Sequence, residues 1–296
     1  LHKNITLTIL YYIMNPAVFQ MFFRFSGKYF YKIDQWFLAI FRQMCYTVQA
    51  VISTRLFFWK GEYMSKKTFS AVILAGGSST RMGGISKQQA LLAGIPVAVR
   101  SMLAFENCSF CKEILVVSKE SECSLYPEYA AKYGIKKFSR AIRGGETRQE
   151  SAFLGMNGVD PDTAYIAFHD AARCLVTPKE IEAVFLCACR YRCATACTEV
   201  TDTVKLVDRH GKTQTEGQPQ RAQLRAMQTP QIFYADLYRA AAYTAQRDGF
   251  TATDDCSLLE HAGFGTKCVP CSRTNLKITT PEDLVLAEAL LRSERD

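Results

Sequence analysis

Apolar positions along the chain fall into short runs that alternate with stretches of helical periodicity. The runs at 71–74 and 113–118 are almost wholly apolar, which is typical of strands buried on both faces of a parallel sheet. Further strands are predicted at 136–142, 165–168, 194–200, 267–270 and 275–279. Helices are predicted at 97–105, 126–133, 152–154, 178–192 and 237–246, and after 253 and 280. This alternation predicts an α/β fold with a doubly wound, mostly parallel, Rossmann-like sheet.

The chain between about 201 and 228 breaks this rhythm, because two extended segments follow each other with no helix between them. Residues 201–207 and 221–227 flank a polar turn at 208–211 and predict a protruding β-hairpin arm. An isolated hairpin is only marginally stable in water. We therefore expect the arm to embrace a partner subunit, as a dimerisation arm.

The composition describes a chain able to bury a sizeable core. Of the 296 residues, 48% are hydrophobic and 22% are charged. Most of the formal net charge of +8 lies in the first 63 residues, since residues 64–296 hold 29 Lys and Arg against 26 Asp and Glu. A near-neutral body lacks the concentrated basic face that nucleic-acid binding needs.

The first 63 residues differ from the rest. They carry 17 of the 35 aromatic residues and both tryptophans. Charged and polar residues interrupt their apolar runs, so we expect neither a bilayer-spanning helix nor a secretory signal. A basic, aromatic helix on a membrane surface is one interpretation. We favour another, in which Met64 is the natural start, residues 1–63 are a non-native or disordered leader, and residues 64–296 form the functional domain.

Twelve cysteines raise the question of metal or disulfide chemistry. The two Cys-x-x-Cys pairs, at 108–111 and 268–271, are separated by 156 residues, far beyond the spacing of a zinc knuckle. Four more cysteines between 187 and 197 lie in an alanine-rich stretch, where small buried thiols are common. We expect structural free thiols and a reducing, cytoplasmic compartment.

A glycine turn follows the first strand. Gly76 and Gly77 lead into Ser78-Ser-Thr, so backbone N–H groups are open to an approaching phosphate. Arg81 and Lys87 add two cations nearby, enough to face a triphosphate. The turn is neither a P-loop nor a Gly-x-Gly-x-x-Gly motif. Taken alone, a Gly-Gly turn is better explained as an ordinary strand-to-helix turn with solvated basic residues.

A second glycine turn and a carboxylate follow later strands. Around Gly145 and Glu146, backbone donors together with Ser151 are candidates for holding a base or ribose edge, and a plain helix start is the alternative. Asp170 follows a buried strand at the carboxyl end of the sheet, where open α/β sheets bind ligands. Thr177 begins a capping box for the next helix, which leaves Asp170 free as a candidate Mg²⁺ ligand.

Together these motifs resemble the 2-C-methyl-D-erythritol 4-phosphate cytidylyltransferase family of the non-mevalonate isoprenoid pathway, across about 69–291. The matching strings stand in the family's order: LAGGSSTRM, SKQ, GGETRQES, HDAAR, TDTVK, MQTPQIF, TDD and NLKITTPEDL. Each string alone is a weak signal, but the ordered set is very specific. The resemblance implies transfer of a cytidylyl group from CTP to 2-C-methyl-D-erythritol 4-phosphate, a polyol phosphate, with release of pyrophosphate.

The resemblance also implies a role for each matching position. The CTP phosphates would lie on Ala75, Gly76 and Gly77. The cytosine and ribose would be bound by Gly145, Glu146 and Ser151. The catalytic cations would be Arg81, Lys87 and Lys277. Mg²⁺ or another divalent cation would be held by Asp170, and the acceptor would be bound by Arg173, Thr201 and Thr253. The family is a homodimer whose arm reaches the neighbouring site.

Two positions depart from the family's pattern. The family usually has a basic residue where Thr201 stands, so a cation for the acceptor phosphate is missing or is supplied by Arg221 or Arg225. Cys174 replaces a usual proline and only softens a turn. The alternatives are therefore a ribitol-5-phosphate cytidylyltransferase of the same fold, or a catalytically silent nucleotide-binding relative. His169 is better explained as a structural hydrogen-bonding group than as a base.

Overall fold

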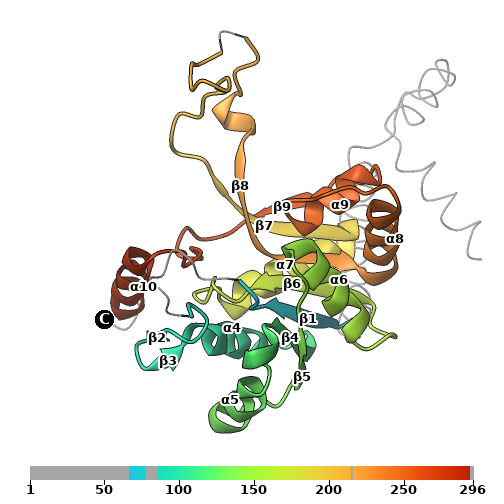
Figure 1. Ribbon diagram of the computed structural model, residues 1–296, viewed down its shortest axis with the longest axis vertical. Coiled ribbons are helices and arrows are strands. Elements are labelled where there is room, and N and C mark those ends of the chain that lie inside the picture. Colours follow the sequence, from blue (N-terminus) through green and yellow to red (C-terminus); the bar gives the residue numbers. More distant parts are fainter. Residues whose placement is uncertain (1–66, 78–85, 215, 294–296) are drawn as a thin grey trace, which may run out of the picture. The chain divides into compact units, whose positions relative to one another are not determined.

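The computed structural model of the protein describes residues 67–77, 86–214 and 216–293. Within them, a seven-stranded sheet has the order β5-β4-β1-β6-β8-β7-β9 (Figure 1). Its strands are β1 (Phe69–Leu74), β4 (Cys111–Ser118), β5 (Phe138–Arg143), β6 (Tyr165–Asp170), β7 (Cys193–Glu199), β8 (Arg225–Tyr234) and β9 (Lys267–Pro270). The short strands β2 (Leu91–Leu92) and β3 (Ile95–Pro96) pair separately.

Most of the sheet is parallel, as predicted. β1 pairs in parallel with β4 and β6, β4 with β5, and β7 with β9. β8 runs antiparallel to both of its neighbours, β6 and β7. The chain winds outward from β1 in both directions, so the carboxyl ends of β1, β4, β5 and β6 meet at one edge. Open α/β sheets bind ligands at this position.

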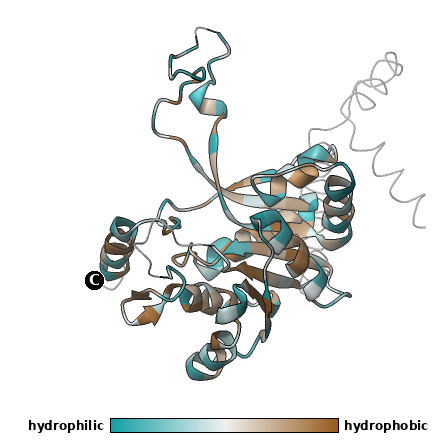
Figure 2. Ribbon diagram, viewed as in Figure 1, coloured by the Kyte–Doolittle hydropathy of each residue, from teal (hydrophilic) through white to brown (hydrophobic). Residues whose placement is uncertain are grey.

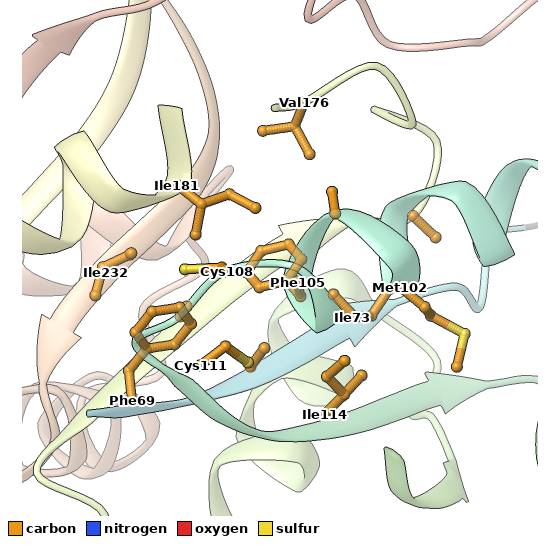
Figure 3. Packing of buried hydrophobic residues seen from close by; sticks show 14 of the residues in the cluster. Phe69, Ile73, Met102, Phe105, Cys108, Cys111, Ile114, Val176, Ile181 and Ile232 are labelled. Atoms are coloured by element: carbon orange, nitrogen blue, oxygen red, sulfur yellow. The ribbon is translucent and has the colours of Figure 1, made fainter. Parts of the chain in front are cut away.

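Helices cover both faces of the sheet, which makes it doubly wound. They are α4 (Val97–Glu106), α5 (Leu125–Tyr133), α6 (Arg148–Gly158), α7 (Pro178–Tyr191), α8 (Ala235–Arg247) and α9 (Asp255–His261). Helix α10 (Pro281–Ser293) packs with Leu92 of β2 in a separate small core. Side chains of β1 alternate between the two layers: Phe69 and Ile73 join the core with α4 and α7, whereas Val72 joins the core with α6 and α8. Figure 3 shows the first core, where Phe69, Phe105 and Ile181 converge.

The chain between β7 and β8 projects from this body as an arm, residues 200–224 (Figure 1). Most of its ribbon is hydrophilic (Figure 2). The predicted pair of strands is wrong here: one isolated bridge joins Val207 to Thr213, a 3₁₀ turn (η3) occupies Arg221–Gln223, and ladder pairing with β7 begins at Arg225. Among the described residues no second layer covers the arm, so burial there does not stabilise a regular ladder.

Elsewhere the predicted helices and strands are present, apart from the strand expected at 275–279, where the structure has irregular backbone. Every cysteine in the described ranges is a free thiol, as expected. Over the same ranges, no helix has the length and apolarity needed to cross a bilayer. The interpretations of residues 1–63 concern a segment outside the described residues.

Candidate active site

A cleft of about 320 Å³ opens at the carboxyl edge of the sheet. Its walls come from the end of β1, the segment before β2, the start of α6, the end of β6 and the segment before α10. The residues that line it are Leu74, Gly76, Gly77, Lys87, Gln88, Gly145, Glu146, Thr147, Arg148, Ser151, Asp170, Ala172 and Lys277. The fold therefore brings both predicted glycine turns, the predicted metal ligand and two of the predicted cations into one cavity.

The wall that follows β1 combines exposed backbone with a nearby cation. Ala75 N donates to Val117 O at 2.7 Å, which ends the ladder, and Gly76 and Gly77 are exposed beyond it. A Cβ on Gly77 would lie 3.3 Å from Lys87 Cε, so the lysine side chain lies over the glycine. A larger residue there would crowd the ammonium group. The turn thus combines accessible backbone with a cation, as phosphate binding requires.

Asp170 lies at the end of β6 with three cations around its carboxylate. Its Oδ2 is 2.8 Å from Lys277 Nζ and 3.9 Å from Arg173 Nε, and its Oδ1 is 3.3 Å from Arg148 Nε. Burial raises the pKa of Asp170, but Arg148, Lys277 and Arg173 outweigh burial and hold that pKa well below its ordinary value. The carboxylate is therefore ionised at neutral pH.

Lys277 reaches the cleft from irregular backbone, not from the last strand that the sequence predicted. Asn275 is fully buried, and its Nδ2 donates to Thr229 O at 2.9 Å. Ile278 N donates to Ala172 O at 2.8 Å. These bonds compete with ladder pairing, which explains the missing strand. They also anchor the backbone on both sides of Lys277.

Arg148 also lines the cleft, although it was not among the residues predicted from the sequence. It is the first residue of α6, and its guanidinium bridges Asp170 and the buried Asp255, with Nη1 2.9 Å from Asp255 Oδ2. The Tyr238 hydroxyl donates to Asp255 Oδ1 at 2.7 Å. Burial raises the pKa of Asp255 even though Arg148 acts to lower it. Arg148 lies in the string GGETRQES, but its partners Asp170 and Asp255 are distant in the sequence, so its role could not be predicted from the string.

His169 supports the floor of the cleft from inside the core. Its Nδ1 is 3.0 Å from Thr229 Oγ1 and its Nε2 is 3.2 Å from Arg173 O. Burial lowers the pKa of His169 to about 4, so the ring is neutral at pH 7. Asp170 N donates to the same Thr229 oxygen at 3.0 Å. The interpretation of His169 as a structural group is confirmed.

The turn from Gly144 to Glu146 leads into α6 and contributes Gly145 and Glu146 to the wall of the cleft. The sequence suggested that its backbone N–H groups bind the ligand, yet all three donate within the chain. Their acceptors, in order, are Ser118 O at 2.8 Å, Ser151 Oγ at 3.1 Å and Glu150 Oε2 at 2.8 Å. The Ser151 hydroxyl in turn donates to Gly145 O at 3.5 Å, so hydrogen bonds within the chain fix the shape of the turn.

Some predicted residues lie away from this cleft. Ala75 is fully buried behind the turn, and Arg81 is outside the described residues. Thr253 lines a separate cavity of about 350 Å³ beside β7 and α9. Thr201 is exposed on the arm, where its carbonyl accepts from Arg221 Nη1 at 3.2 Å.

Arg173 connects the cleft with the base of the arm. Beyond its approach to Asp170, Nη1 donates to Asn275 O at 3.0 Å and Nη2 to Met227 O at 3.3 Å. Its guanidinium is therefore mostly engaged in holding the segments that carry Lys277 and the start of β8. Binding of an acceptor phosphate by Arg173 would share these donors.

A divalent cation fits beside Asp170 if phosphates accompany it. In the described part of the chain, no group of three or more His, Cys, Asp or Glu side chains could hold a metal by itself. Mg²⁺ is commonly bound by one or two carboxylates together with substrate phosphates and water. The single carboxylate of Asp170, next to the glycine turn, matches that donor set.

Comparison with known proteins points to one family. A family model described as 2-C-methyl-D-erythritol 4-phosphate cytidylyltransferase matches residues 69–293. The protein of that name from Caldanaerobacter subterraneus is 40% identical over 229 residues, which cover 75% of this chain and 98% of the relative. Its counterpart from Halalkalibacterium halodurans is 38% identical over 224 residues, with 75% and 96% covered.

Solved structures show the same similarity in three dimensions. The 4-diphosphocytidyl-2C-methyl-D-erythritol synthase of Anaerococcus prevotii superposes with a TM-score of 0.68 at 26% identity, covering 76% of this chain and 99% of that chain. The 2-C-methyl-D-erythritol 4-phosphate cytidylyltransferase of Thermus thermophilus gives a TM-score of 0.61 at 27% identity, with 76% and 99% covered. Both similarities extend over nearly the whole of the compared protein.

Proposed function

The chain belongs to the 2-C-methyl-D-erythritol 4-phosphate cytidylyltransferase family, and we propose that its cleft transfers a cytidylyl group from CTP to 2-C-methyl-D-erythritol 4-phosphate. The products are 4-diphosphocytidyl-2-C-methyl-D-erythritol and pyrophosphate, in the non-mevalonate route to isoprenoid precursors. One observation carries the proposal. The glycine turn with Lys87 and the ionised Asp170 with Lys277 line the same cleft.

The reaction needs positioning and charge stabilisation more than proton transfer. An oxygen of the acceptor's phosphate attacks the α-phosphorus of CTP, the bond to the β-phosphate breaks, and pyrophosphate leaves. A phosphate monoester is largely dianionic at neutral pH, because its second pKa is about 6. No general base is required, which agrees with a buried, neutral His169.

The cations of the cleft have distinct positions for this chemistry. Lys87, over Gly77, is placed to stabilise charge that builds on the transferred phosphate. Lys277, held above Asp170, is placed to orient the phosphates and the acceptor. Arg81 follows the same glycine turn in the sequence, and we assign it to the same charge stabilisation as Lys87.

Asp170 is the residue that would hold Mg²⁺ in this site. A bound divalent cation supplies positive charge to the phosphate oxygens and orients the triphosphate. Asp170→Asn keeps the shape of the side chain but removes its charge. We expect the variant to need more Mn²⁺ for half-maximal binding in the presence of CTP, measured by electron paramagnetic resonance. An unchanged Mn²⁺ titration would place the metal elsewhere.

The acceptor and the arm complete the proposal. Val204, Leu206 and Val207 are 40–52% exposed on the arm, more apolar surface than a solvated loop needs. We propose that these side chains contact a second copy of the chain in a homodimer, which brings Thr201 and Arg221 to the neighbouring cleft. Free thiols throughout the described residues suit the reducing cytoplasm.

Pyrophosphate release on mixing the protein with CTP and one acceptor at a time tests the proposed function. Release with 2-C-methyl-D-erythritol 4-phosphate and little with ribitol 5-phosphate is the expected result. Faster release with ribitol 5-phosphate would reassign the acceptor and leave the nucleotide half of the proposal standing. Binding of CTP without release in either mixture would identify a silent nucleotide-binding relative.

A further inference from the structure

A hydrogen bond between a hydroxyl and a carboxylate joins the segment that carries Lys87 to the 3₁₀ turn η2 (Glu120–Glu122), which lies just beyond the end of β4. Ser86 Oγ donates to Glu122 Oε1 at 3.1 Å, although the two residues are 36 positions apart in the sequence. Ser86 directly precedes Lys87, whose side chain lies over Gly77 in the cleft. The bond to Ser86 therefore acts on the backbone that carries this ammonium group.

The backbone is held on both sides of Lys87. On the far side, Gln88 O accepts from Ala98 N, at the start of α4, at 3.0 Å. On the near side, Ser86 makes one hydrogen bond that leaves its own turn among the described residues, and the acceptor is Glu122. The position of Lys87 thus depends on α4 from one direction and on Glu122 from the other.

The Ser86 hydroxyl has two acceptors within reach. Gln88 Oε1 lies 3.5 Å away in the same turn, against 3.1 Å for the Glu122 carboxylate. A hydroxyl donates one hydrogen, and a bond to a charged acceptor is stronger than a bond to a neutral one. The hydroxyl is therefore directed to Glu122. If the carboxylate were removed, the hydroxyl would turn to Gln88, which connects the turn only to itself.

Glu122 is an unfavourable residue for folding at this position. It is 8% exposed, and its Oε2 is buried without a hydrogen-bond partner in the described part of the chain. A buried acceptor without a partner lowers stability, because it has lost its hydrogen bonds to water. Local arrangements that oppose folding in this way are found mainly at functional sites. The bond to Ser86, and not stability, is therefore the better explanation for a carboxylate here.

We propose that Glu122 is a positioning residue for the transfer reaction, which fixes the backbone of Lys87 through Ser86 and so keeps the ammonium group at the phosphate turn. The inference rests on the proposed function. Misplacement of a reacting group by about 1 Å can slow a reaction about a hundredfold. A fixed backbone matters most as charge builds on phosphorus, when the lysine must already be in place. Glu122 does not line the cleft, so it acts only through its neighbours.

The test measures steady-state kinetics with CTP and 2-C-methyl-D-erythritol 4-phosphate in Ser86→Ala and Glu122→Ala. Both variants remove the same bond, so kcat should fall about tenfold in each, with little change in the KM for CTP. The double variant should fall no further than either single variant. Ser86→Thr keeps the hydroxyl and should retain most of kcat.

The comparison with Lys87→Ala separates positioning from a general loss of structure. If Glu122 acts through Lys87, adding Glu122→Ala to Lys87→Ala should cause no further loss of kcat. A loosened fold would lower kcat with or without the lysine. Urea unfolding shows whether each variant folds, and Ser86→Ala carries the test if Glu122→Ala does not, because Ser86 is only half-buried.

Ser109→Ala is the matched control. Ser109 Oγ donates to Glu182 Oε1 at the same distance of 3.1 Å, but neither residue lines the cleft, so kcat should not change. An unchanged kcat in Ser86→Ala and Glu122→Ala, or an equal loss with and without Lys87, would overturn the role of Glu122 and leave the proposed function standing. Absence of pyrophosphate release by the unmodified protein would overturn the proposed function as well.

Discussion

The cleft at the carboxyl edge of the sheet and the arm between β7 and β8 carry the two halves of the predicted site. The cleft is assembled within one chain: Gly77, Lys87, Asp170 and Lys277 line a single cavity. On the arm, Thr201 is exposed, with its carbonyl bonded to Arg221 from the same arm. The sheet itself brings together residues at the carboxyl ends of its parallel strands. Residues on a segment that projects from the sheet, such as the arm, are not brought to the cleft in this way.

The charged groups around Asp170 are buried or half-buried, whereas those of the arm are exposed. In the cleft, Asp170 is buried among Arg148, Arg173 and Lys277, so its charge interactions are strong and its neighbours are fixed. The arm's side chains are almost all exposed, and exposed charge contacts are weak and screened by salt. Changes in the cleft should therefore have large effects on catalysis, and changes on the arm should have smaller effects confined to the acceptor.

The largest effect is expected from Lys87→Ala. Its ammonium group is needed mainly as charge builds on phosphorus, so kcat should fall about a hundredfold, the scale for loss of one preorganised donor. The KM for CTP should change little. Arg81→Ala should behave alike. Lys136→Ala is the control, because Lys136 is an exposed lysine outside the cleft. Steady-state kinetics measure both variants. An unchanged kcat in Lys87→Ala would show that Lys87 takes no part in the reaction.

A pH effect on stability should come from His169 beneath the cleft. Burial lowers its pKa to about 4, whereas an unfolded histidine has a pKa of about 6.5. Between these values the unfolded chain binds the extra proton, so the free energy of unfolding falls as pH falls from 6.5 to 4, by about 3 kcal/mol. Urea titrations at pH 7 and 4.5 measure this loss. His169→Gln should lack this part of the pH slope, and an equal slope in both proteins would contradict a buried, neutral ring.

Thr201→Arg tests the arm with a smaller expected effect. An added cation facing the acceptor's phosphate should lower the KM for the acceptor roughly tenfold, the scale of a charge-assisted hydrogen bond, and leave the KM for CTP unchanged. Thr213→Arg, also on the arm, is the control. No change in Thr201→Arg, together with a raised acceptor KM in Arg221→Ala, would show that Arg221 already supplies the cation.

The structure favours Arg221 over Arg225 for that substitute role. Arg221 donates to the backbone of Thr201, so its guanidinium lies at the position in question. Arg225 Nη1 is engaged with Ala222 O at 3.0 Å and Leu224 O at 2.7 Å. Arg225→Ala should therefore change the acceptor KM less than Arg221→Ala does.

The smallest effect is expected from removal of residues 1–63. The family match begins at residue 69, and among the described residues the lining of the cleft begins at Leu74. A chain that starts at Met64 should retain kcat and both KM values within twofold. A truncated protein that folds but has lost activity would show that the segment contributes to the site.

Periodicity was sufficient to predict the sheet and most helices, because continuous apolar runs such as β1 are buried on both faces. It failed for the arm, which is exposed, and for the backbone around Lys277, where side-chain hydrogen bonds decide the conformation in place of apolar burial. Asn275, which anchors that backbone, reads in the sequence as one more residue of a strand.

The lining of the cleft was predictable where glycines or a carboxylate lie at or just beyond the end of a strand, as Gly76, Gly77 and Asp170 do. Arg148 escaped prediction because its role depends on Asp170 and Asp255, which only the folded chain brings to it. The starts of α6 and α7 have the same Thr-x-x-Glu pattern, so the sequence did not predict that Glu150 and Glu180 accept hydrogen bonds from different backbone N–H groups.

The central claim is that the cleft joins CMP to the phosphate of a polyol phosphate. ³¹P NMR of a mixture of protein, CTP, Mg²⁺ and 2-C-methyl-D-erythritol 4-phosphate directly follows formation of the diphosphate bond between CMP and the acceptor. The account predicts loss of the triphosphate signals, appearance of pyrophosphate, and a new pair of mutually coupled doublets from the diphosphate product. Lys87→Ala should form that pair about a hundredfold more slowly. Persistence of the CTP and acceptor signals, or equal rates in both proteins, would contradict the account.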